Sequence, residues 1–130
     1  MTTHTRTITS VIAEGTSNAA GATTRGRADV RGADIVKVHI RLTNGGSAPT
    51  LAAEARILFS DTDGAQPAAA ADGADWKTEV SGITAGTLAS AVRNYVGYFP
   101  GGQTHVEVEV TGNTGQAITC ECTIVATVLS

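Results

Sequence analysis

The fold is decided by residues 105–128, "HVEVEVTGNTGQAITCECTIVATV". Residues 105–111 alternate apolar and polar side chains without interruption, which predicts a half-buried β-strand. Its expected inward side chains are Val106, Val108 and Val110, and its expected solvent-facing side chains are His105, Glu107 and Glu109. The turn-forming "GNTGQ" that follows predicts a tight hairpin to a last strand over residues 117–128.

A second clear strand, "IVKVHIRLT" at residues 35–43, carries the opposite charge on its polar face. The inward set is Val36, Val38, Ile40 and Leu42, and the outward set is Lys37, His39 and Arg41. Opposite charges directly across two strands stabilise a sheet. We therefore expect this strand to neighbour residues 105–111; the alternative is that one charged stripe meets its complement on another subunit.

The rest of the chain predicts more short strands separated by turns. We expect strands over residues 5–13 and 51–60, with a helix over residues 51–58 as the alternative to the second, and a short strand starting at Trp76. Residues 14–34 predict a long loop that could include a short strand near residues 28–31. Residues 87–96 predict either one short helix or a strand that ends at Phe99. Seven or eight strands predict an all-β fold, an antiparallel β-sandwich or jelly roll. Residues 1–130 then form a single domain with an extended N-terminal arm.

The composition narrows the function classes. Hydrophobic residues make up 42% and charged residues 16%, a balance that argues against disorder. With a net charge of −3 there is no basic surplus for a nucleic-acid partner. No apolar run approaches the roughly 18 residues of a membrane span, and "MTTHTRTITS" lacks the apolar segment of a signal peptide. We expect a protein made in the cytoplasm, with neither nucleic acid nor membrane as a partner.

Both cysteines, Cys120 and Cys122, fall on the apolar face of the last strand. A free cysteine behaves as a small hydrophobe, so core packing is the favoured interpretation. An inter-chain disulfide is the alternative; a metal site would need two more ligands, which the histidines are not spaced to supply. No nucleophile, phosphate loop or dinucleotide motif is present, so we expect no enzyme, no cofactor and no metal.

Aromatic residues are scarce, at 4% of the chain. The segment "NYVGYFPGG" offers Tyr95, Tyr98 and Phe99. Sugar-binding sandwiches present exposed aromatic platforms, and Tyr95 with Tyr98 is the candidate pair. The alternative is that these rings are needed in the core or at an interface, where tyrosine keeps a polar tip in water.

Several segments together resemble small β-sandwich virion proteins of tailed bacteriophages. These are the Thr- and Ala-rich opening "TRTITSVIAEGTSNAAG", the "GGSAPTL" turn, "DWKTEV" and the closing "HVEVEVTGNTGQAITCECTIVATV". The resemblance covers most of the chain as a pattern. It implies a structural role in the virion, most simply as a capsid decoration (cement) protein, or as a neck, collar or tail component. It also implies a homo-oligomer assembled in the host cytoplasm, with the major capsid protein or neck and tail proteins as partners.

The residues that we expect at such interfaces lie in three segments: the N-terminal arm, the 14–34 loop and the aromatic segment. They are Thr3, His4, Arg6, Arg25, Arg27, Arg31, Tyr95, Tyr98 and Phe99. A carbohydrate-binding or adhesion module is the alternative function.

Overall fold

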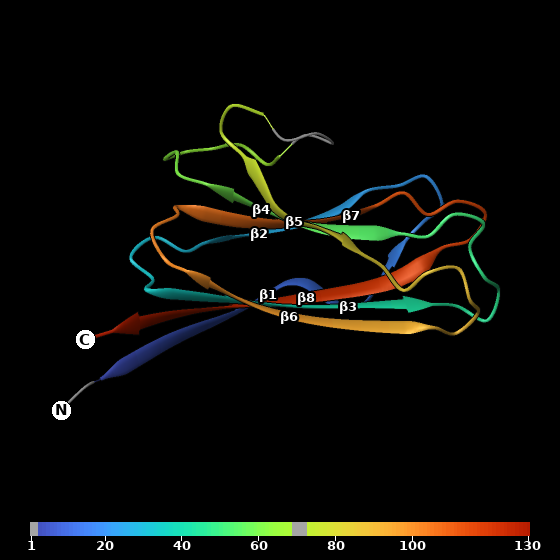
Figure 1. Cartoon of the computed structure of the whole chain (residues 1–130), viewed down its shortest axis with the longest axis horizontal. Coiled ribbons are helices and arrows are strands. Elements are labelled where there is room, and N and C mark those ends of the chain that lie inside the picture. Colours follow the sequence, from blue (N-terminus) through green and yellow to red (C-terminus); the bar gives the residue numbers. More distant parts are fainter. Residues whose placement is uncertain (1–2, 69–72) are drawn as a thin grey trace.

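The computed structural model describes residues 3–68 and 73–130, which fold into two stacked antiparallel sheets (Figure 1). The strands are β1 (His4–Asn18), β2 (Thr24–Asp29), β3 (Ile35–Asn44), β4 (Glu54–Ser60), β5 (Lys77–Ile83), β6 (Val92–Pro100), β7 (His105–Thr111) and β8 (Ile118–Leu129). The described residues contain no helix, so none that is long and apolar enough to cross a membrane. Over residues 87–96 the helix alternative is wrong, because residues 87–91 form a turn and β6 begins at Val92.

Sheet A has the strand order β1-β8-β3-β6, and sheet B has the order β2-β7-β4-β5. Almost every strand is followed by a strand of the other sheet, which is the connectivity of an eight-stranded jelly roll. The predicted fold class is therefore confirmed. The predicted hairpin at "GNTGQ" is wrong, because β7 and β8 belong to different sheets and residues 112–117 cross between them.

The core lies between the two sheets and is built from the inward positions of each strand. The four inward side chains of β3 are at most 1% exposed, as the alternation of that strand predicted: Val36, Val38, Ile40 and Leu42. Val106, Val108 and Val110 of β7 face them from sheet B with no exposed surface. Alternation thus identified which residues share the buried face.

The predicted 14–34 loop is largely strand. β1 continues to Asn18, and β2 occupies Thr24–Asp29. The short strand considered near residues 28–31 overlaps only the end of β2. Most of β2 escaped prediction because its inward positions, Thr24, Gly26 and Ala28, are small rather than large and apolar. There is no room for a side chain at Gly26, because a Cβ there would lie 2.5 Å from the carbonyl oxygen of Val11. This is where β1 and β2 close one side of the sandwich.

The N-terminal segment is paired backbone rather than a free arm. β1 begins at His4, in register with Leu129 of β8, and the amide of Thr3 donates to the carbonyl of Ser130 at 2.9 Å. β3 first meets β8 at Thr127, so the chain ends beyond it form a two-stranded ribbon that projects from the sandwich (Figure 1).

Glu107 and Glu109 of β7 are buried, contrary to prediction, and the basic side chains beside them are not those of β3. β3 lies in the other sheet, so the arginines come from β2 and β4 instead. Glu109 is fully buried and accepts hydrogen bonds from Arg25 Nε at 3.1 Å and Arg56 Nε at 3.0 Å. Glu107 is also fully buried, and burial raises its pKa even though the amide of Ala68 donates to it.

The described parts of the connection between β4 and β5, residues 61–68 and 73–76, cover the Glu107 end of this outer side of sheet B. A small apolar cluster holds the connection in place; its members are Leu58, Ala65, Ala68 and Trp76. The indole of Trp76 donates to the carbonyl of Gln66, and Arg27 donates to the carbonyl of Ala65. One end of the outer side of sheet B is therefore covered, whereas a hollow beside Arg56 and Glu109 leaves the other end open. No strand or connection among the described residues packs on the outer face of sheet A.

Candidate interaction surface

The outward side chains of sheet A line up in rows across β1, β8, β3 and β6, and together we call them the outer A face. The rows follow from the strand register. In order they are Arg6, Thr127, Ile35 and Pro100; Ile8, Val125, Lys37 and Tyr98; Ser10, Thr123, His39 and Val96; Glu121, Arg41 and Asn94; and Thr119, Thr43 and Val92.

Several large apolar side chains of this face are exposed to solvent. Ile8 is 70% exposed and Tyr98 is 69% exposed, one at each edge of the second row. Val92 and Val96 of β6 are 45% and 47% exposed. Single exposed apolar residues are ordinary on a soluble protein, but a contiguous group of them marks an interaction site.

The first two rows form a shallow hollow of about 390 Å³. Its lining is Arg6, Ile8, Ile35, Lys37, Tyr98, Val125 and Thr127. The ammonium of Lys37 lies 5.7 Å from the centre of the Tyr98 ring, a cation–π distance that steadies both side chains. The hollow is apolar with a basic rim.

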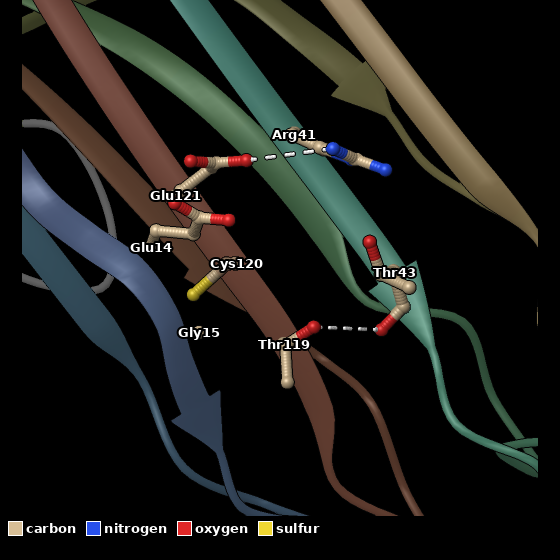
Figure 2. Close-up of a pocket in the computed structure, with 7 residues that line it drawn as sticks. All are labelled: Glu14, Gly15, Arg41, Thr43, Thr119, Cys120 and Glu121. Carbon is tan, nitrogen blue, oxygen red and sulfur yellow. Dashed lines mark hydrogen bonds and ion pairs between the residues drawn. The ribbon is translucent and has the colours of Figure 1, made fainter.

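A second hollow of about 220 Å³ lies at the other end of the face and has an acidic rim (Figure 2). It arises at a β-bulge in β1. Ile12 and Thr16 are four positions apart on β1, but their partners on β8, Cys122 and Cys120, are only two positions apart. Gly15 makes this bulge with φ of 78°, a conformation that costs a glycine little. The bulge displaces Glu14 toward Glu121, whose carboxylate lies 4.0 Å from the Arg41 guanidinium.

The two cysteines lie in the core of this sheet as free thiols. Cys120 is 2% exposed and Cys122 is 1% exposed. Burial raises the pKa of both, that of Cys122 to about 12, with the neighbouring Cys120 adding to the shift. A protonated, buried thiol is a poor nucleophile and a poor metal ligand. Among the described residues no three His, Cys, Asp or Glu side chains gather as metal ligands would.

The structure divides the aromatic candidates between two environments. Tyr98 belongs to the outer A face, whereas Tyr95 and Phe99 are partly buried and pack against the core. Phe99 meets Phe59 edge to face, with ring centres 5.2 Å apart. Tyr95 and Tyr98 therefore lie on opposite sides of β6 and do not form a joint platform.

The charged candidates are also divided. Arg6 lies on the outer A face beside Ile8, while Thr3 and His4 lie in the projecting ribbon. Arg25 and Arg27 belong to the outer side of sheet B, where they bind Glu109 and the Ala65 carbonyl. Arg31 is held by Asp29 and Asp63.

Sequence reasoning missed most of the apolar members of the outer A face: Ile8, Ile35, Val92, Val96 and Val125. For Ile35 and Val125 the signal was a break in alternation. Val125 follows Ile124 and Ile35 precedes Val36, so each pair puts an apolar side chain on both sides of a strand. Only a group of such residues on neighbouring strands indicates an interaction surface, and the sequence does not show which strands are neighbours.

No family model and no curated protein matches this chain. Solved structures do match its fold. VP2 of infectious bursal disease virus, in its subviral particle, superposes with a TM-score of 0.60 at 13% identity over 96% of this chain. The chain spans only 33% of that VP2 chain.

Two further proteins share the fold. Murine APRIL matches with a TM-score of 0.54 at 9% identity, over 95% of this chain and 99% of its own. The K3 adhesin domain of Lys-gingipain from Porphyromonas gingivalis matches with a TM-score of 0.52 at 11% identity, over 85% of this chain and 72% of its own. The superpositions show that these proteins share the jelly-roll fold. At identities this low they show nothing about shared chemistry.

Proposed function

We propose that the protein is a non-enzymatic structural component of a virus particle and that it works by burying its outer A face against other subunits. The observation that carries the proposal is the contiguous set of exposed apolar side chains on a sheet that nothing in the described chain covers. The VP2 fold match supports a particle role, because that protein is described in assembled particles and this chain matches one part of it.

The virus class follows from the sequence pattern rather than from the fold. The segments that resemble tailed-bacteriophage virion proteins favour a capsid decoration protein, and a neck, collar or tail component is the second position. In either place the mechanism is the same: apolar surface leaves water when subunits dock, at roughly 25 cal/mol per Å².

A carbohydrate-binding or adhesion role has weaker support. Tyr98 is exposed, but Trp76 is 4% exposed and Tyr95 turns toward the core. A sugar ring would thus stack on one tyrosine alone. The same exposed ring fits a protein interface, where tyrosine supplies a large contact area at low entropic cost.

Immunogold electron microscopy tests the proposal directly. Antiserum raised against the purified chain would be applied to virus particles that have been purified from cultures in which the chain is expressed. Regular labelling of the capsid supports decoration, and labelling confined to the neck or tail supports the alternative position. Particles that carry no label, from cultures in which the chain is expressed, would contradict a virion role.

A further inference from the structure

We infer that the occupant of the outer A face is a second copy of this chain, packed face to face about a twofold axis that runs parallel to the strands between β8 and β3. The inference rests on the proposed assembly role and goes beyond it, because it names the partner and the orientation. The evidence is the order of side chains within each row of the face.

A twofold axis along the strands reverses every row onto itself. The second row then places Ile8 over Tyr98 of the second copy, and Tyr98 over its Ile8. Both are about 70% exposed in the single chain, so each pair removes apolar surface that is otherwise in water. In an isologous dimer every such contact occurs twice.

The same reversal makes the fourth row electrostatically complementary. Glu121 of β8 is placed over Arg41 of the second copy, and Arg41 over its Glu121. Within one chain the nearest atoms of the two side chains are 4.0 Å apart, which is too far for a hydrogen bond. Across the dimer each would gain a second partner of opposite sign, which favours the register that aligns them.

The other face-to-face arrangement, with the axis across the strands, is unfavourable. It would place Lys37 over Arg41 of the second copy, and Val125 over its Glu121. The first contact opposes like charges, which the axis along the strands avoids. The second sets a charge against Val125, as the axis along the strands also does with Lys37, so the like-charge contact is the one that discriminates. The side-chain order of this face therefore selects one of the two axes.

The face is large enough for a dimer. Four strands spaced about 4.8 Å apart and about nine residues long, at a rise of about 3.3 Å, give a plane on the order of 600 Å² per copy. Both copies together bury roughly 1,100 Å², which is above the roughly 1,000 Å² that a biological interface should exceed. Two sheets packed in this way stack about 10 Å apart, which suits side chains of the size of isoleucine and tyrosine.

A charge-swap experiment tests both the partner and the orientation. The variants are Arg41→Glu, Glu121→Arg and the double variant, with Arg93→Glu as the control. Arg93 is an exposed arginine on β6 in register with the inward-facing Leu42, so it lies off the outer A face. Masses are measured by light scattering over a range of concentrations, and folding is checked by near-ultraviolet circular dichroism.

We expect the unmodified chain and Arg93→Glu to form the same dimer. Arg41→Glu alone and Glu121→Arg alone each oppose like charges across the axis, so their dissociation constants should rise at least tenfold. An equimolar mixture of these two variants should form a heterodimer, because every contact across the axis again joins opposite charges. The double variant should recover its homodimer for the same reason.

The mixture is the decisive sample, since it restores the contacts between chains but not the Arg41–Glu121 pair within a chain. A mixture that stays monomeric overturns the proposed orientation, and a monomeric unmodified chain overturns the twofold dimer. Stronger association of Arg41→Glu alone would identify the axis across the strands instead, since the introduced carboxylate would then face Lys37 of the second copy. Immunogold labelling is independent of these results, so the virion role and the dimer can fail separately.

Discussion

Ile8 of β1 and Tyr98 of β6 stand at the two edges of one row across sheet A, with Val125 and Lys37 between them. Residues from the two edges of the sheet thus form one band of apolar side chains on the solvent side, interrupted by Lys37. Such a band adds nothing to the core of a single chain, so its energetic contribution is expected only when subunits dock.

Replacing Ile8 by threonine tests whether this side chain contributes to docking between subunits but not to the folding of one chain. Because Ile8 is 70% exposed, Ile8→Thr should change the unfolding free energy of dilute protein by less than about 0.5 kcal/mol. It should also weaken the rise of melting temperature with protein concentration that dimer formation produces. Denaturant titration and scanning calorimetry measure the two effects.

Ile12→Thr on the same strand is the matched control. Ile12 is 4% exposed in the core, so the same substitution there should cost about 2–4 kcal/mol through lost packing and a buried hydroxyl. Equal effects at the two positions would mean that Ile8 is part of the core and that the outer A face is assigned wrongly.

Gly26 is required by the close approach of β1 and β2. A Cβ at this position would lie 2.5 Å from the Val11 carbonyl oxygen, so Gly26→Ala must push two strands apart and should cost about 1–3 kcal/mol. Gly45→Ala, where the same atom meets nothing within 4 Å, should stay within about 0.5 kcal/mol of the parent. A Gly26→Ala variant as stable as Gly45→Ala in urea would argue against this packing.

The buried carboxylate of Glu109 stabilises the outer side of sheet B through two arginines. Glu109→Gln removes the charge that Arg25 and Arg56 share, and should cost about 3 kcal/mol, at the lower end for a buried ion pair because Arg25 keeps solvent contact. Glu79→Gln changes an exposed carboxylate of β5 in the same way and should have little effect. If urea unfolding shows the two variants to be alike, the network contributes no net stability.

Cys122 gives the stability a defined pH dependence. Its pKa is about 12 in the folded chain against an ordinary 9.0, so the folded state keeps a proton that the unfolded state releases. The unfolding free energy should therefore fall as pH rises above about 9. Cys122→Ala should flatten that fall from about pH 9 upward, whatever its stability at neutral pH. Parallel curves for parent and variant would show that the thiol does not contribute.

Alternation in the sequence predicted which side chains share a face but not what covers that face. On β3 both the strand and its core residues were predicted correctly. On β7 the inward valines were correct, yet Glu107 and Glu109 are buried because the segment between β4 and β5 folds back over them. That contact joins residues 39 positions apart in the chain, and no local pattern encodes it.

The candidate surface was only partly predictable for a related reason. Arg6 and Tyr98 were identified from the sequence, but their proximity to Ile8 and Val125 depends on which strands are neighbours. The sheet order brings β1 beside β8 and β8 beside β3, an arrangement set by the jelly-roll connections rather than by any one segment. β2 was missed because its inward residues are small where the sandwich closes against β1.

The most direct measurement is the solution mass of the unmodified chain by light scattering across a roughly hundredfold range of concentration, with and without reductant. We predict a transition from the 13.2 kDa chain to a particle of twice that mass, unchanged by reductant because both cysteines are buried. A dimer that reductant splits would mean that the cysteines join the subunits. A 13.2 kDa monomer at every concentration would contradict self-association through the outer A face.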